Sequence, residues 1–137
     1  MNAYLDIETS FSRDITVVGI YFDNGVLKQL VGMEITKDNI MKVLKDVKII
    51  YTYNGSRFDL PVIKKKLDID LSSIFECYDL MYDCWNCGLY GGLKSVEKQL
   101  GISRKLDMDG NDAMVLWEEY ITTNNKTSLK YLLEYNY

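Results

Sequence analysis

Histidine is absent from the 137-residue sequence. Its absence excludes Ser-His-Asp and Cys-His nucleophile systems, zinc sites with histidine ligands and histidine general bases. Any acid–base or metal chemistry in this chain must therefore use carboxylates, tyrosine, lysine or cysteine.

Long apolar runs and a basic N-terminal leader are also absent. No stretch approaches the roughly 18 apolar residues that a transmembrane helix needs, and no secretory signal pattern opens the chain. We therefore expect a cytoplasmic protein with no membrane partner, folded as one domain over residues 1–137. The net charge of −4 argues against nucleic-acid binding by bulk electrostatics but leaves room for binding through cations.

Cysteine is scarce, and the three residues present are Cys77, Cys84 and Cys87. Cys84 and Cys87 form a C-x-x-C motif, whose redox role requires a preceding strand and a helix that opens at the first cysteine. A zinc site would need a second pair of ligands, which the sequence does not offer. The pattern favours buried, inert thiols.

The first half of the chain alternates between strand and helix patterns. β-Branched and aromatic residues predict an antiparallel meander, with a turn at Asp23-Asn24-Gly25. Its expected strands cover Asn2–Glu8, Ile15–Phe22 and Val26–Val31. A short helix over about 36–45 and a largely apolar strand, Val47–Tyr53, follow.

The second half is mostly helical, apart from a possible short strand over Cys77–Met81. Apolar spacing and capping residues predict helices over Asp59–Lys66, Leu93–Leu100, Asp112–Ile121 and from Ser128 to the C-terminus. This order of elements predicts an α/β domain with a mixed sheet.

Asp6 and Glu8 lie two residues apart on the first expected strand. Side chains alternate faces along a strand, so both carboxylates point one way while Leu5 and Ile7 point the other. A divalent cation would relieve the repulsion between the two carboxylates. A half-exposed strand has the same alternation, so the pair alone leaves both interpretations open.

A further acidic residue, Asp59, follows a strand-to-helix junction. Ligands of α/β folds gather at the carboxyl ends of strands, where this junction is expected. Helix capping is the alternative, because Ser56 and Asp59 have the spacing of a capping box. The junction reads Asn54-Gly55-Ser56-Arg57-Phe58-Asp59.

Asp6-x-Glu8, the meander and Asn54-Gly55-x-x-Phe58-Asp59 together resemble the first two motifs of the DEDD 3′–5′ exonucleases, in particular the YprB-like branch. Tyr135 matches the tyrosine that opens the third motif in the tyrosine subclass. The resemblance implies a ribonuclease H-like fold with helices on both faces of the sheet. The aspartate of that third motif would fall two residues after Tyr137. We expect the domain to be truncated at its C-terminus, and the alternative is a natural variant that lacks this ligand.

The resemblance also implies a mechanism with two Mg²⁺ or Mn²⁺ ions about 3.5–4 Å apart. Asp6 would bridge both ions, Glu8 and Asp59 would each bind one, and Tyr135 would orient the attacking water. The implied substrate is the 3′ end of single-stranded DNA or RNA, contacted by Asn54, Phe58 and Arg57. Without the last carboxylate, we expect weak metal binding and slow cleavage.

Two alternatives to this exonuclease prediction remain. A non-catalytic module of the same fold, binding nucleic acid or a protein, is compatible with the acidic composition. Asp6-Ile7-Glu8-Thr9 resembles the D-x-D-x-T motif at the start of phosphatases with an aspartyl nucleophile. That motif requires aspartate at the position of Glu8. For Phe58, packing in the hydrophobic core is as reasonable as contact with a nucleotide.

Overall fold

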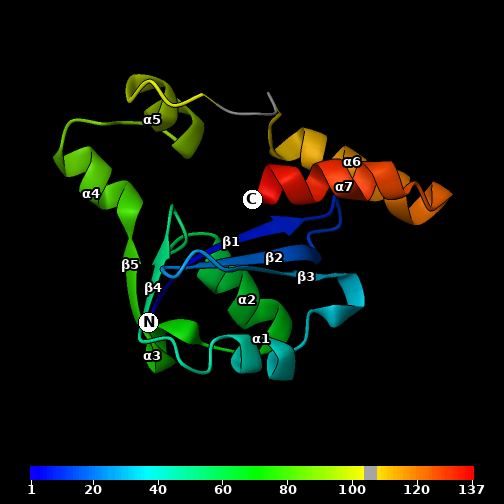
Figure 1. Ribbon diagram of the computed structural model, residues 1–137, viewed down its shortest axis with the longest axis horizontal. Coiled ribbons are helices and arrows are strands. Elements are labelled where there is room, and N and C mark those ends of the chain that lie inside the picture. The colour runs from blue at the N-terminus through cyan, green and yellow to red at the C-terminus, as the bar shows by residue number, and fades with distance from the viewer. Residues whose placement is uncertain (104–107) are drawn as a thin grey trace.

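The computed structural model describes residues 1–103 and 108–137, and its centre is a five-stranded sheet (Figure 1). The strands lie in the order β3-β2-β1-β4-β5. Their bounds are β1 (Asn2–Thr9), β2 (Ile15–Phe22), β3 (Leu27–Val31), β4 (Ile49–Thr52) and β5 (Glu76–Asp79).

The sheet combines antiparallel and parallel pairing. β1, β2 and β3 form the predicted antiparallel meander, β4 pairs with β1 in parallel, and β5 pairs with β4 in parallel. Gly25 has a φ of 87° in the predicted turn, a conformation that glycine adopts without steric cost. The mixed sheet predicted from the sequence is confirmed.

Helices cover both faces of the sheet (Figure 1). The helices on one face are α1 (Lys37–Val43), α2 (Asp59–Leu67) and α3 (Leu71–Ile74), preceded by a 3₁₀ turn at Gly32–Glu34. The other face carries α6 (Gly110–Thr123) and α7 (Lys126–Asn136). The remaining helices, α4 (Leu80–Asn86) and α5 (Leu93–Gln99), follow β5.

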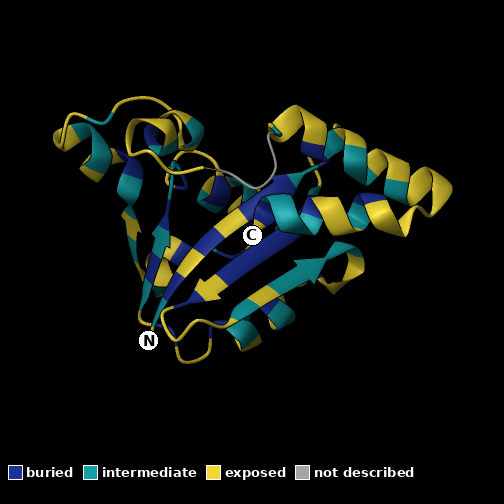
Figure 2. Cartoon of the chain, turned by 45° about the horizontal axis from the view of Figure 1, so that its top comes forward, coloured by how far each residue is buried: buried dark blue, intermediate teal, exposed yellow. Residues whose placement is uncertain are grey.

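The alternation along β1 separates two hydrophobic clusters. Ala3, Leu5 and Ile7 are buried in the larger cluster together with residues of α1, α2 and α3. The smaller cluster joins Val17 of β2 to buried residues of α6 and α7. Buried positions accordingly run along the inner strands, while outward-facing positions of α6 and α7 are exposed (Figure 2). None of the described helices is both long and apolar enough to cross a bilayer.

Two predicted strands end earlier in the structure than the sequence indicated. The strand predicted over Cys77–Met81 ends at Asp79, because the Asp79 side chain accepts a hydrogen bond from the Met81 backbone and starts α4. The strand predicted to reach Tyr53 ends at Thr52, and Asn54 then adopts a left-handed conformation with a φ of 60°. The left-handed residue redirects the chain from β4 toward α2.

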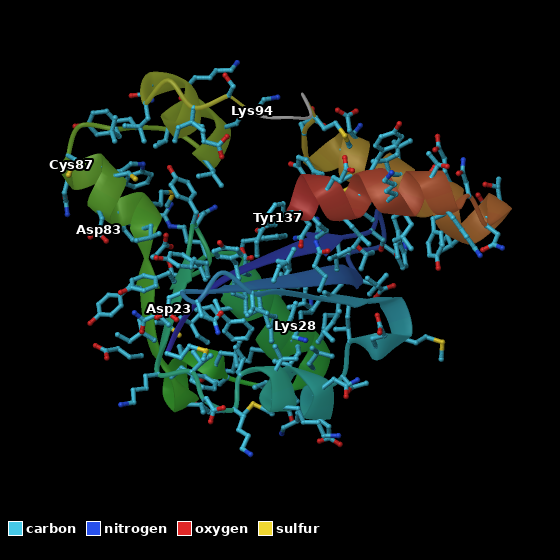
Figure 3. The ribbon with its side chains drawn as sticks, in the orientation of Figure 1. Asp23, Lys28, Asp83, Cys87, Lys94 and Tyr137 are labelled. Carbon is cyan, nitrogen blue, oxygen red and sulfur yellow. The ribbon has the colours of Figure 1, made fainter. Side chains whose placement is uncertain are left out.

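The C-x-x-C motif lies at the end of a helix. Cys84 is in the last turn of α4, and Cys87 follows that turn at the outer end of the helix (Figure 3). Both thiols are free. A redox motif has its first cysteine at the start of a helix, so the geometry required for that chemistry is not met.

Candidate functional site

Asp6 and Glu8 project from β1 toward the face that carries α6 and α7. Their backbone partners on β2 are Gly19 and Val17, and Val17 belongs to the cluster beneath those helices. Asp6 is exposed, whereas only 9% of Glu8 is exposed. A solvated strand face therefore explains Asp6 but does not explain Glu8.

Asp59 reaches β1 from the start of α2. Its side chain is 3% exposed, and Oδ2 accepts a hydrogen bond of 2.9 Å from the backbone N–H of Ile7. The capping alternative is wrong, because α2 has no side-chain cap and the Ser56 hydroxyl donates to Asp79 instead. The fold thus brings a carboxylate 52 positions away beside the first strand.

Asp59 and Asp6 act on each other electrostatically. Burial, and then the charge of Asp6, raise the pKa of Asp59 from 3.8 to about 8, against a lowering effect of the Ile7 N–H. A hydrogen bond between the two carboxyl groups acts in the same upward direction. Without a cation, the pair therefore holds a proton near neutral pH.

The carboxyl pair fits a hard divalent cation. Mg²⁺ prefers oxygen ligands, and proteins commonly supply only one or two carboxylates while water and phosphate complete the coordination. Asp6 is exposed, so the pair is open to solvent. In residues 1–103 and 108–137, no three acidic, cysteine or histidine side chains are grouped closely enough to hold a metal, so Glu8 does not extend the pair into a cage.

Asn136, a residue that the sequence did not point to, lies over Asp6 and Glu8. Its Nδ2 is 3.4 Å from Asp6 Oδ2 and 3.5 Å from Glu8 Oε1. Gln29 of β3 donates to Asn136 Oδ1 at 3.1 Å, which orients the amide so that its N–H groups face the acids. The last turn of α7 thereby links the two carboxylates of β1.

Gly19 gives Asn136 the space it occupies. A Cβ added at Gly19 would lie 2.1 Å from Asn136 Oδ1, which no packed structure tolerates. We expect Gly19→Ala to displace Asn136 and lower the free energy of unfolding by about 1–3 kcal/mol, the usual cost of overpacking. Urea denaturation measures this loss.

Gly110→Ala is the matched control, because nothing lies within 4 Å of a Cβ at Gly110. Its free energy of unfolding should stay within about 0.5 kcal/mol of the unsubstituted protein. Equal effects of the two substitutions would contradict the close contact between Gly19 and Asn136.

Asp79 fixes the junction between β4 and α2. Its carboxylate accepts hydrogen bonds from the Asn54 N–H at 2.8 Å and from the Ser56 N–H and hydroxyl at 3.2 and 2.5 Å. Burial alone would raise the pKa of Asp79, but the hydrogen bonds, that of the Ser56 hydroxyl foremost, leave it lowered. Asn54 Oδ1 is buried and has no hydrogen-bond partner among the described residues.

The other candidate residues lie around this junction and on α7. Phe58 is 42% exposed, so packing in the core is excluded. Arg57 is exposed and donates from Nε to the Tyr82 hydroxyl at 3.0 Å. Tyr135 is half-buried and packs against the cluster of Val17, Ala113 and Leu132.

One solved structure similar to this chain is that of the family B DNA polymerase from the hyperthermophilic archaeon Pyrobaculum calidifontis. The TM-score is 0.75 at 16% sequence identity, a likeness that shows the fold. It covers 98% of this chain and 22% of the polymerase chain. A search of curated proteins found no match.

The family comparison agrees with the mixed sheet and its helices. The family model described as RNase_H superfamily matches residues 3–137, nearly the whole chain. The ribonuclease H-like fold expected from the sequence is thus confirmed. The chain belongs to the RNase_H superfamily and has the nuclease fold of that superfamily.

Proposed function

We propose that this chain is a divalent-metal-dependent 3′–5′ exonuclease of the DEDD type, tyrosine subclass. The observation that carries the proposal is the approach of Asp59 to the first strand, where its carboxyl group accepts the Ile7 N–H at 2.9 Å and is hydrogen-bonded to the carboxyl group of Asp6. Two adjacent carboxylates repel each other and so destabilise the folded state. A bound cation would relieve this repulsion, which is why we interpret the pair as a metal site.

The proposed roles follow the chemistry of each side chain. Asp6 and Asp59 would hold one cation as a pair, and Glu8 would serve a second cation separately, because the three do not form one cage. Asn136 donates hydrogen bonds that orient Asp6 and Glu8. Bound Mg²⁺ or Mn²⁺ would supply Lewis-acid stabilisation of phosphate oxygens and an activated water. Tyr135 would orient that water through its hydroxyl group.

The proposed substrate is the 3′ end of single-stranded DNA or RNA. The structural neighbour is a DNA polymerase, which agrees with a nucleic-acid ligand. Exposed Phe58 would pack against a base or sugar, Arg57 would contact a phosphate, and Asn54 would bind the terminal nucleotide.

A labelled oligonucleotide tests this proposal. With Mn²⁺, a single strand labelled at its 5′ end should give a ladder of products shortened one nucleotide at a time, and EDTA should stop the reaction. A strand labelled at its 3′ end should release the label as the first product. Internal cleavage, or shortening from the 5′ end, would refute the exonuclease assignment.

A non-catalytic binding module of the same fold is the second candidate. It is favoured by the lack of a three-residue metal cage among the described residues. Oligonucleotide binding without metal-dependent cleavage, in the same assay, would select this alternative.

A further inference from the structure

Arg57 is held by two aromatic side chains of α4 that have no assigned role. Its guanidinium carbon lies 5.6 Å from the centre of the Tyr82 ring and 5.8 Å from that of the Trp85 ring. The Tyr82 hydroxyl accepts the Nε–H of Arg57, and the two rings meet edge to face at 5.4 Å. Contacts from both rings fix the plane of the guanidinium group.

The charge of Arg57 is not neutralised by any residue that the structure describes. Among residues 1–103 and 108–137 it forms no ion pair, whereas Lys64 pairs with Asp70 and Lys66 pairs with Asp14. The arginine side chain has five N–H donors, and only the Nε–H donates to Tyr82. An exposed arginine with a fixed plane, and with donors that the described residues do not use, is suited to bidentate contact with a phosphate.

The loop and the helix that form this cluster are joined by Asp79. The same carboxylate that accepts hydrogen bonds from Asn54 and Ser56 also accepts the Met81 N–H at the start of α4. Arg57 and its two aromatic partners therefore belong to one connected unit. Within that unit, Arg57 is two positions before Asp59 in the sequence.

We propose that Arg57, Tyr82 and Trp85 form a phosphate-binding site for a nucleic-acid strand, in which Tyr82 and Trp85 are positioning residues that act through Arg57. Because Tyr82 and Trp85 already hold the guanidinium group of Arg57 in place, the side chain loses less conformational entropy when it binds a phosphate. Binding is tighter for that reason. The inference rests on the proposed nucleic-acid substrate, but it concerns binding and not cleavage.

Fluorescence anisotropy with a labelled oligo-dT strand, at low salt and in EDTA, tests the site. EDTA prevents hydrolysis, so the result does not depend on the exonuclease assignment. We expect Arg57→Ala to raise Kd about tenfold or more, because a charge-assisted contact is lost. The slope of log Kd against log salt should fall by about 0.7, the value of one phosphate contact on a single strand.

Lys65→Ala is the matched control, since it also removes one exposed positive charge, from the last turn of α2. It should change Kd less than about twofold. Arg57→Lys keeps the charge but loses the planar contacts, so it should keep the salt slope and recover only part of the affinity.

Tyr82→Phe tests the positioning role, because it keeps the ring and removes the hydroxyl. We expect a several-fold rise in Kd in the unsubstituted protein and no further rise when Arg57 is already alanine. An equal rise in both backgrounds would overturn the positioning role.

Three other results would overturn the site itself. These are no binding by the unsubstituted protein, equal Kd for Arg57→Ala and Lys65→Ala, or binding of inorganic phosphate as tight as that of the strand. Melting temperatures within a few degrees of the unsubstituted protein verify that each variant is folded. Arg57-dependent binding without any Mn²⁺-dependent cleavage would leave the site standing and refute only the proposed activity.

Discussion

Asp6→Ala is expected to lower the rate of 3′-end shortening at least about 100-fold. Loss of residues that merely support metal ligands costs about 10- to 100-fold, and Asp6 is proposed as a direct ligand. Asp6 also supplies the negative charge that acts on Asp59. The measurement is the initial rate of shortening of a 5′-labelled oligonucleotide at saturating Mn²⁺.

Asp38→Ala controls for the loss of one exposed negative charge. Asp38 lies in the first turn of α1, on the helical layer opposite α6 and α7, and it should leave the rate within about twofold. If Asp6→Ala cleaved as fast as Asp38→Ala, any observed activity would belong to a different site or to a contaminant.

Asp59→Asn is expected to stabilise the metal-free protein at pH 8. The amide keeps an oxygen that accepts the Ile7 N–H but removes the ionisable group that burial and Asp6 disfavour as an anion. Urea denaturation in EDTA should show a gain of at least about 1 kcal/mol over the unsubstituted protein at pH 8. Near pH 3, below both pKa values, Asp59 is mostly protonated in the folded and the unfolded state, so the two proteins should be nearly equal.

The direction in which stability changes with pH follows from the number of protons that Asp59 binds in the folded and unfolded states. The pKa of Asp59 is about 8 in the folded state and 3.8 when unperturbed, so the folded protein binds more protons between these values. Stability must then fall as pH rises through this window, by on the order of 1 kcal/mol per pH unit. Stability that rose with pH in EDTA, or a loss of stability in Asp59→Asn at pH 8, would contradict the proton-sharing pair.

Local patterns predicted the sheet and the carboxylates of its first strand. β1 and β2 were predictable because alternation and β-branched residues are properties of neighbouring residues. The junction of Asn54 and Asp59 was predictable because the motif order resembles a known family. Neither pattern predicts the contact between Asp59 and Ile7. That contact arises only because α2 packs close to β1 in the folded chain.

The rest of the site depends on packing between distant segments. The segment that forms α4 combines aromatic residues and cysteines, which are modest helix formers, so the strand prediction extended into it. Asp79, which is a favourable residue for capping a helix N-terminus, was the feature of the sequence that could have predicted the start of α4. Asn136 carries no local signal, because its role arises only where α7 crosses Gly19, more than a hundred positions away in the chain.

Isothermal titration calorimetry of Mn²⁺ binding near pH 7, in buffers of different ionisation enthalpy, measures whether the carboxyl pair receives a cation. Binding should release up to one proton per chain, since the cation displaces the proton shared by Asp6 and Asp59. Asp59→Asn should abolish the proton release and weaken binding. Mn²⁺ binding that released no proton and was unchanged in Asp59→Asn would show that the two carboxyl groups are not a metal site.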